Sequence, residues 1–218
     1  MKKTLINWFG LFGTISLISY ILGVIFAPLA YPEYNWISQP ITDLYTVDAP
    51  SFALWNQLAS LYAIGALVCV SMLSIAVQGK WNRPLRSGIY LMSGILWFSS
   101  IGSAILRFSA TGDAITFPDF TIDILDIVVM LSIIASMILV MVGGYRKKRF
   151  VSIAVSATVA LILLFIGIIS VLLLSAEYAG IAHRLVIFPV NGFVALLGLY
   201  LFIGKLNDDS ITVSQANT

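Results

Sequence analysis

The stretch from 151 to 174 reads VSIAVSATVALILLFIGIISVLLL and contains no charged side chain. As an α-helix rising about 1.5 Å per residue it would be about 36 Å long, and the hydrocarbon core of a bilayer is about 30 Å thick. In lipid each unpaired backbone polar group costs several kcal/mol, and a helix pairs these groups within one segment. This stretch is therefore predicted to be a transmembrane helix.

Five further apolar runs have the length and character of the first. None of the six alternates between polar and apolar residues as the strands of a transmembrane barrel do, so the predicted fold class is all-α. The expected architecture is a six-transmembrane-helix bundle in one membrane domain, residues 1–206, followed by a polar cytoplasmic tail, 207–218. The predicted spans are 5–30, 52–77, 89–108, 122–142, 151–174 and 185–203.

The composition agrees with a membrane protein and excludes several other classes. Apolar residues make up 60% and charged residues 10% of the 218 positions, against about 25% charged in globular proteins. The net charge of +2 is too small to indicate a nucleic-acid partner. Because the chain has one cysteine, Cys69, and one histidine, His183, we expect no intrachain disulfide, no Cys/His zinc site and no two-histidine haem. No metal or cofactor is predicted.

The basic residues indicate how the bundle is oriented. Ten of the twelve Lys and Arg residues fall on one side of the six spans, together with only two acids, Asp208 and Asp209. Arg107 and Arg184 fall on the other side with the remaining eight acids. Cytoplasmic loops are enriched in Lys and Arg, so both chain ends are predicted to be cytoplasmic. The expected location is the plasma membrane, as a multi-pass protein.

Arg184 opposes both this charge bias and the dipole of the helix that it opens, since a helix N-terminus already presents positive charge. A compensating anion is expected, either a bound ligand or the carboxylate of Asp43, Asp126 or Glu177. The alternative is an arginine solvated at the membrane interface. Arg107 closes its helix, where the dipole favours a cation and a long side chain can reach the interface. We predict that Arg107 joins the same cluster.

Asp119, Asp123 and Asp126 are spaced by four and three residues, so they share one face of the fourth span. The first two suit a helix N-terminus. Asp126 lies about 10 Å deeper, where an acid is expected to face the bundle interior or a wet cavity and to need a partner. This spacing predicts an ion-pairing or functional role for Asp126.

Other polar residues have a functional and a structural interpretation. His183 could titrate near neutral pH beside Arg184, or it could be a polar anchor at the interface. Asn56, one turn into the second span, is either a cap for the first outer loop or a donor in a pocket. Ser99 and Ser103 form a small-xxx-small pair, which favours close helix packing over a polar lining.

The first outer loop carries a spaced set of residues: Tyr31-Pro32-Glu33-Tyr34, Ile41-Thr42-Asp43-Leu44, Pro50 and Trp55-Asn56. With Arg184 at the start of the last span, this set resembles a bacterial and archaeal family of six-helix membrane proteins. That family is known only as a domain of unknown function, the nine-hundred-ninety-eighth so described. Thr42 stands where serine is commoner, and Tyr45 where glycine is frequent. The resemblance implies no activity, but it singles out Asp43, Asn56 and Arg184.

The leading functional hypothesis is non-enzymatic. The protein would bind or move a membrane lipid or a small amphiphile, or support an envelope process, through a polar extracytoplasmic site. An alternative is a membrane enzyme acting on lipid headgroups, with Asp43 or Asp126 as the acid/base and Arg184 holding the anion. A second alternative is a proton-coupled transporter that uses Asp126. The candidate site residues are Asp43, Asn56, Arg107, Asp123, Asp126, Glu177, His183 and Arg184.

Overall fold

A computed structural model describes residues 3–79, 81–110 and 119–206, with the backbone alone for 103–110 and 119–123. Over this part of the chain the regular structure is entirely helical, which confirms the all-α prediction. The α-helices are α1 (Leu5–Phe9), α2 (Leu11–Phe26), α3 (Phe52–Leu58), α4 (Ser60–Ala76), α5 (Arg83–Ala110), α6 (Asp119–Tyr145), α7 (Val151–Leu173) and α8 (Ala179–Phe202). The 3₁₀ turns are η1 (Ala27–Ala30), η2 (Ile41–Leu44), η3 (Lys148–Phe150) and η4 (Ala176–Tyr178).

Five helical segments are long and apolar enough to cross a membrane, and they match five of the six predicted spans. The remaining predicted span, 89–108, lies inside α5, a helix of 28 residues. The described residues of α5 do not form one of the five candidate membrane-spanning segments. The five segments are Leu5–Ala30, Phe52–Ala76, Ile124–Tyr145, Lys148–Leu173 and Ala176–Phe202.

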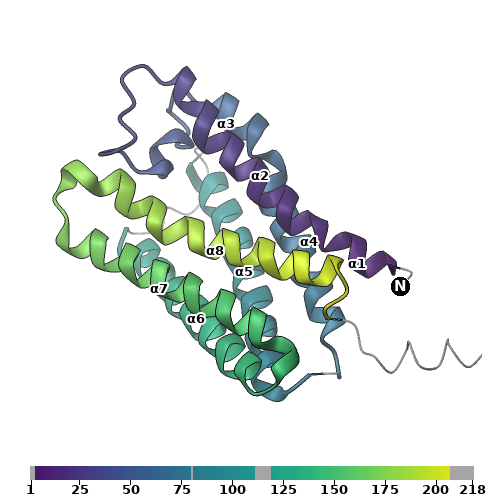
Figure 1. The fold of residues 1–218 in the computed structure, drawn as a ribbon. Helices are drawn as coiled ribbons and strands as arrows, with labels where there is room; N and C mark the ends of the chain where they lie inside the picture. The colour runs from purple at the N-terminus through teal and green to yellow at the C-terminus, as the bar shows by residue number, and fades with distance from the viewer. Residues whose placement is uncertain (1–2, 80, 111–118, 207–218) are drawn as a thin grey trace, which may run out of the picture.

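The long helices form a closed ring. Around it α2 packs on α4, α4 on α5, α5 on α6, α6 on α7 and α7 on α8, and α8 returns to α2. Figure 1 shows α8 between α2 and α7. α8 also contacts α4 across the ring, and half of its most apolar window is buried, the largest share of the five candidate spans. The helix that carries Arg184 is therefore the most enclosed one.

One face of α7 is apolar and exposed along its length. Val155, Val159, Ile162, Ile166 and Ile169 are between 46% and 55% exposed, and they recur every three or four residues, so they share one side of the helix. A contiguous apolar surface of this kind is rare in a protein surrounded by water. It is the surface expected of a helix in contact with lipid.

Two glycines meet at one close approach between helices. Gly10, at the junction of α1 and α2, faces Gly198 of α8, and a Cβ at either position would overlap the carbonyl oxygen of the other. The sulfur of Cys69, a fully buried residue of α4, fills the space beside them, 2.8 Å from where a Cβ of Gly198 would lie. Small residues permit such approach between membrane helices, and here they join α2, α4 and α8.

α5 packs closely on α6 at Gly88. A Cβ on Gly88 would lie 2.8 Å from the Ser136 carbonyl oxygen, and the Ser136 hydroxyl donates to the Gly88 carbonyl at 2.7 Å. Ser99 lines a cavity between α4, α5 and α8, and the side chain of Ser103 lies outside the described residues. Close helix packing at Ser99 and Ser103 therefore stays a prediction.

Candidate functional site

The segment between α2 and α3, residues 31–51, folds over the first turns of α8, as Figure 1 shows. Its 3₁₀ turn η2 coincides with the Ile-Thr-Asp-Leu box and is fixed by Ile41 and Leu44, which are both fully buried. The buried Ser51 hydroxyl donates to the Leu44 carbonyl at 2.9 Å. The loop is thereby anchored next to the helix that carries Arg184.

Gly180 brings the loop backbone against the start of α8. A Cβ at this position would overlap the Gln39 carbonyl oxygen and lie 2.5 Å from that of Trp36, so no other residue fits without movement of the loop. The Ile181 amide, which has no acceptor within its own helix at this position, donates to the Ile37 carbonyl at 3.2 Å. Loop carbonyls therefore gather at the N-terminus of α8.

Arg184, one turn further along α8, donates to the same group of oxygens. Its Nη1 donates to the carbonyls of Trp36 at 2.7 Å, Gly180 at 2.8 Å and Gln39 at 3.3 Å. Its Nη2 donates to the Tyr34 hydroxyl at 3.0 Å. The partial negative charge of three carbonyl oxygens offsets the cation at the helix N-terminus, which answers the electrostatic conflict seen in the sequence.

Tyr34 links the guanidinium to the loop. Its hydroxyl lies 3.1 Å from the carbonyl oxygens of Gln39 and Pro40, to which it donates, while it accepts from Arg184. Burial raises the pKa of Tyr34, and the hydrogen bond from Arg184 acts in the opposite direction. The pKa remains above its usual value, so the hydroxyl is neutral at physiological pH and serves as both donor and acceptor.

One edge of the Arg184 guanidinium remains available. Arginine has five N–H donors in a planar fork. The hydrogen bonds described above use Nη1 and one hydrogen of Nη2, so the Nε hydrogen and the second Nη2 hydrogen have no acceptor among the described residues. An edge of two parallel N–H groups matches the two oxygens of a carboxylate or a phosphate.

The predicted ion pair of Arg184 is not formed within the described part of the chain. No carboxylate of Asp43, Asp126 or Glu177 is among its partners, because backbone carbonyls of the loop and of Gly180 occupy Nη1. Glu177 is exposed in η4, and Asp126 is exposed on α6. Asp43 is half-buried in η2 and acts electrostatically on Tyr34 and His183, so it belongs to the same end of the bundle.

The other predicted residues lie apart from the guanidinium or beyond what the structure describes. Asn56 is exposed on α3 and makes no hydrogen bond to a described residue. The adjacent residue Trp55 is the one whose side chain is buried in the bundle. His183 lines a smaller cavity of about 230 Å³ with Pro40 and the end of α7. Its Nδ1 is buried without a partner among the described residues. The side chains of Arg107 and Asp123 are outside the described part of the chain.

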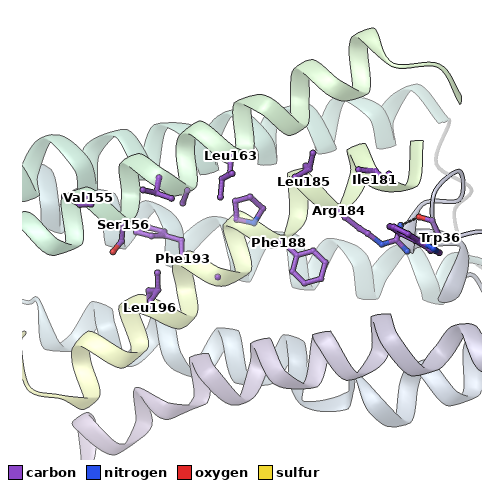
Figure 2. Close-up of a pocket in the computed structure, with 14 residues that line it drawn as sticks. Trp36, Val155, Ser156, Leu163, Ile181, Arg184, Leu185, Phe188, Phe193 and Leu196 are labelled. Atoms are coloured by element: carbon purple, nitrogen blue, oxygen red, sulfur yellow. Dashed lines mark hydrogen bonds between the residues drawn. The ribbon is translucent and has the colours of Figure 1, made fainter. Parts of the chain in front are cut away.

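An apolar groove runs between α7 and α8, with a volume of about 590 Å³ (Figure 2). Arg184 and Trp36 lie at one end of it and Ser156 toward the other. Arg184 is the only charged residue among the described residues that line it. From Arg184 to Leu196 the groove follows α8 for about 18 Å at the helical rise. The lining, called here the α7–α8 groove, is Trp36, Val155, Ser156, Val159, Ala160, Leu163, Ile181, Arg184, Leu185, Phe188, Pro189, Gly192, Phe193 and Leu196.

Two residues of α8 explain why the groove is hollow. At Gly192 a Cβ would meet no atom of the described chain within 4 Å, so the missing side chain leaves open space. Pro189, inside α8, has no N–H and cannot bond to the Leu185 carbonyl. Gly167 of α7 approaches that carbonyl closely, since a Cβ there would lie 2.7 Å from its oxygen. The two helices therefore touch at Gly167 and leave space beside Gly192.

Most residues of this site were not among the predicted ones. The sequence signal for Tyr34 is its place in the Tyr31-Pro32-Glu33-Tyr34 motif of the first outer loop. Trp36, Gly180 and Gly192 carry no signal of their own. All three act through a backbone carbonyl or through the absence of a side chain, and their effect depends on what lies opposite.

The helices and the site together define the class of protein. The described part of the chain has five candidate membrane-spanning helices, and apolar residues face outward on them, so the protein is a multi-pass helical membrane protein. Residues 14–200 match the family described as "Protein of unknown function (DUF998)", and the chain belongs to that family. This confirms the resemblance seen in the first outer loop. No curated protein and no solved structure is similar to it.

Proposed function

We propose that the protein binds a membrane lipid, or another amphiphile with an anionic group, in the α7–α8 groove. The observation that carries this proposal is the position of the Arg184 guanidinium at one end of an otherwise uncharged, apolar groove. The free Nε and Nη2 edge would receive a phosphate or carboxylate oxygen pair, and the hydrocarbon chain would lie along Leu163, Phe188 and Gly192.

The energetics favour such a ligand over a purely apolar one. Hydrocarbon gains little on moving from lipid into an apolar groove, because lipid tails are as apolar as the lining. Selectivity therefore rests on the polar end. A hydrogen bond to a charged group contributes about 1.5–3 kcal/mol, and a bidentate pair adds geometric specificity. This supports recognition of the anionic group, with the chain serving to place it.

We also propose that the Arg184 end faces the outside of the plasma membrane and that both chain ends are cytoplasmic. The structure supports this by bringing basic residues of separate segments to one end of the bundle. Lys3 lies 3.3 Å from the ring centroid of Phe202, and Arg149 donates to the Lys205 carbonyl at 3.3 Å. Such a cluster is typical of a cytoplasmic face.

Single cysteines test this orientation on intact cells. Val47→Cys and Tyr178→Cys, at exposed positions near the Arg184 end, should react with a membrane-impermeant thiol reagent. Gln78→Cys and Lys148→Cys, also exposed, should react only after permeabilisation. The wild-type chain supplies the blank, because Cys69 is fully buried. Labelling of the second pair alone would reverse the proposed orientation.

Native mass spectrometry of the protein purified in mild detergent tests the binding function. We expect a bound species of one amphiphile per chain, and its fragmentation should yield a phosphate- or carboxylate-bearing headgroup. The binding proposal fails if the protein carries only detergent. It also fails if the ratio of anionic to neutral lipids bound to the protein equals the ratio in the membrane.

A further inference from the structure

A second cavity lies between α4, α5 and α8 and shares no lining residue with the α7–α8 groove. Its volume is about 160 Å³, which corresponds to about five water molecules at about 30 Å³ each. Much of its wall is polar, in contrast to the groove. The polar lining residues are Tyr62 from α4, Ser99 and Ser100 from α5, and Asn191 from α8.

This cavity lies deep in the bundle. Asn191 is twelve residues from the start of α8 at Ala179, which places it about 18 Å along the helix. A bilayer is about 40–45 Å thick including its interfaces, and its hydrocarbon core is about 30 Å thick, so this depth is near the middle of the membrane. Polar groups at that depth cannot reach headgroups or bulk water and are costly unless they are satisfied within the protein.

One buried polar atom of this cavity lacks such a partner among the described residues. The Tyr62 hydroxyl donates to Asn191 Oδ1 at 3.2 Å, but Asn191 Nδ2 is buried with no acceptor among the described residues. Because a hydroxyl can donate or accept, one end of the amide is unsatisfied in either orientation of the side chain. Ser99 Oγ makes no hydrogen bond to a described residue either, but it is not one of the fully buried atoms. An unsatisfied buried group costs about 1–3 kcal/mol.

We propose that this cavity is a hydrated binding site for a small uncharged polar molecule, held by hydrogen bonds to Asn191 and Ser99. The χ2 torsion of asparagine is broad, so the amide can turn toward a guest. No charged side chain lines the cavity among the described residues, and burial of an unpaired ion there would be far costlier than burial of a neutral molecule. The guest is therefore a neutral hydrogen-bonding molecule of about glycerol size, and water fills the site without it.

Cysteine chemistry tests whether the cavity holds water. Thiols react as thiolates, which form in water and not in hydrocarbon. Ser99→Cys should react with the small neutral reagent methyl methanethiosulfonate at least about tenfold faster than Ile101→Cys, whose parent side chain is 55% exposed on the outside of α5. A charged methanethiosulfonate should react with Ser99→Cys much more slowly. Ala66→Cys, at a second lining position on α4, provides an independent site.

Glycerol then tests whether the cavity takes a guest. Glycerol should slow the modification of Ala66→Cys, which leaves Asn191 and Ser99 in place, whereas sucrose at equal osmolality, being too large to enter, should not. Adding Asn191→Leu should abolish the protection by glycerol. Equal reactivity of Ser99→Cys and Ile101→Cys would show that the cavity is dry. If Ala66→Cys reacts at the same rate with and without glycerol, the cavity holds water alone. Either result would overturn the proposal and would leave the α7–α8 groove untouched.

Discussion

Replacing Gly192 with Leu should remove the bound amphiphile from the purified protein. A side chain at this position projects into the open space of the α7–α8 groove, where a Cβ meets no described atom within 4 Å. The new side chain would therefore begin in open space and occupy the path of the hydrocarbon chain. We expect at least about a tenfold loss of affinity, equivalent to about 1.4 kcal/mol, measured as the bound fraction in native mass spectra.

Gly94→Leu is the matched control. Gly94 of α5 also has no described atom within 4 Å of a Cβ, but it is exposed and does not line the groove. Both substitutions replace a glycine inside a helix, which favours the helix by up to about 1 kcal/mol, so both variants should fold. Loss of the amphiphile from both variants, or from neither, would contradict a binding site beside Gly192.

Arg184→Ala should reduce both the stability of the bundle and the binding of the amphiphile. The carbonyls of Trp36, Gly180 and Gln39 and the Tyr34 hydroxyl would lose their charged donor. We expect a loss of about 2–3 kcal/mol in the free energy of unfolding, measured in denaturant or as a fall in Tm. Affinity for the amphiphile should fall about 10- to 100-fold.

Two further variants separate these effects. Arg184→Lys keeps the charge but loses the planar fork, so it should recover part of the stability and little of the binding. Tyr34→Phe removes one loop contact and leaves the free guanidinium edge in place, so it should lower stability and largely retain binding. If Arg184→Lys binds the amphiphile as well as the wild type, the bidentate recognition is wrong.

The fold was largely predictable because its signal is long and redundant. Each apolar run extends over about twenty residues, so errors of a few positions do not change the assignment of a span. What the sequence did not predict are the interruptions at Gly10 and Ala59, which divide two spans into α1–α2 and α3–α4. At Gly10 the cause is a close contact with Gly198, a residue far away in the sequence.

The site was predictable only in part. Arg184 could be found because a cation at a helix N-terminus on the acidic side is electrostatically anomalous. The hydrogen-bond partners of Arg184 could not be predicted from the sequence, because every residue has a backbone carbonyl. The same holds for the groove, which exists because Gly192 and Pro189 of α8 face a particular part of α7. Such a hollow depends on the packing of two helices and not on either one alone.

The selectivity of the groove for an anionic group is the central claim, and one comparison tests it directly. Oleate and oleyl alcohol have the same hydrocarbon chain and differ at the group that would meet Arg184. At equal mole fraction in the detergent micelle, oleate should raise the Tm of the wild-type protein, since a ligand that binds only the folded state stabilises it. Oleyl alcohol should raise it much less, and Arg184→Ala should remove the difference. An equal rise with both compounds would contradict the account.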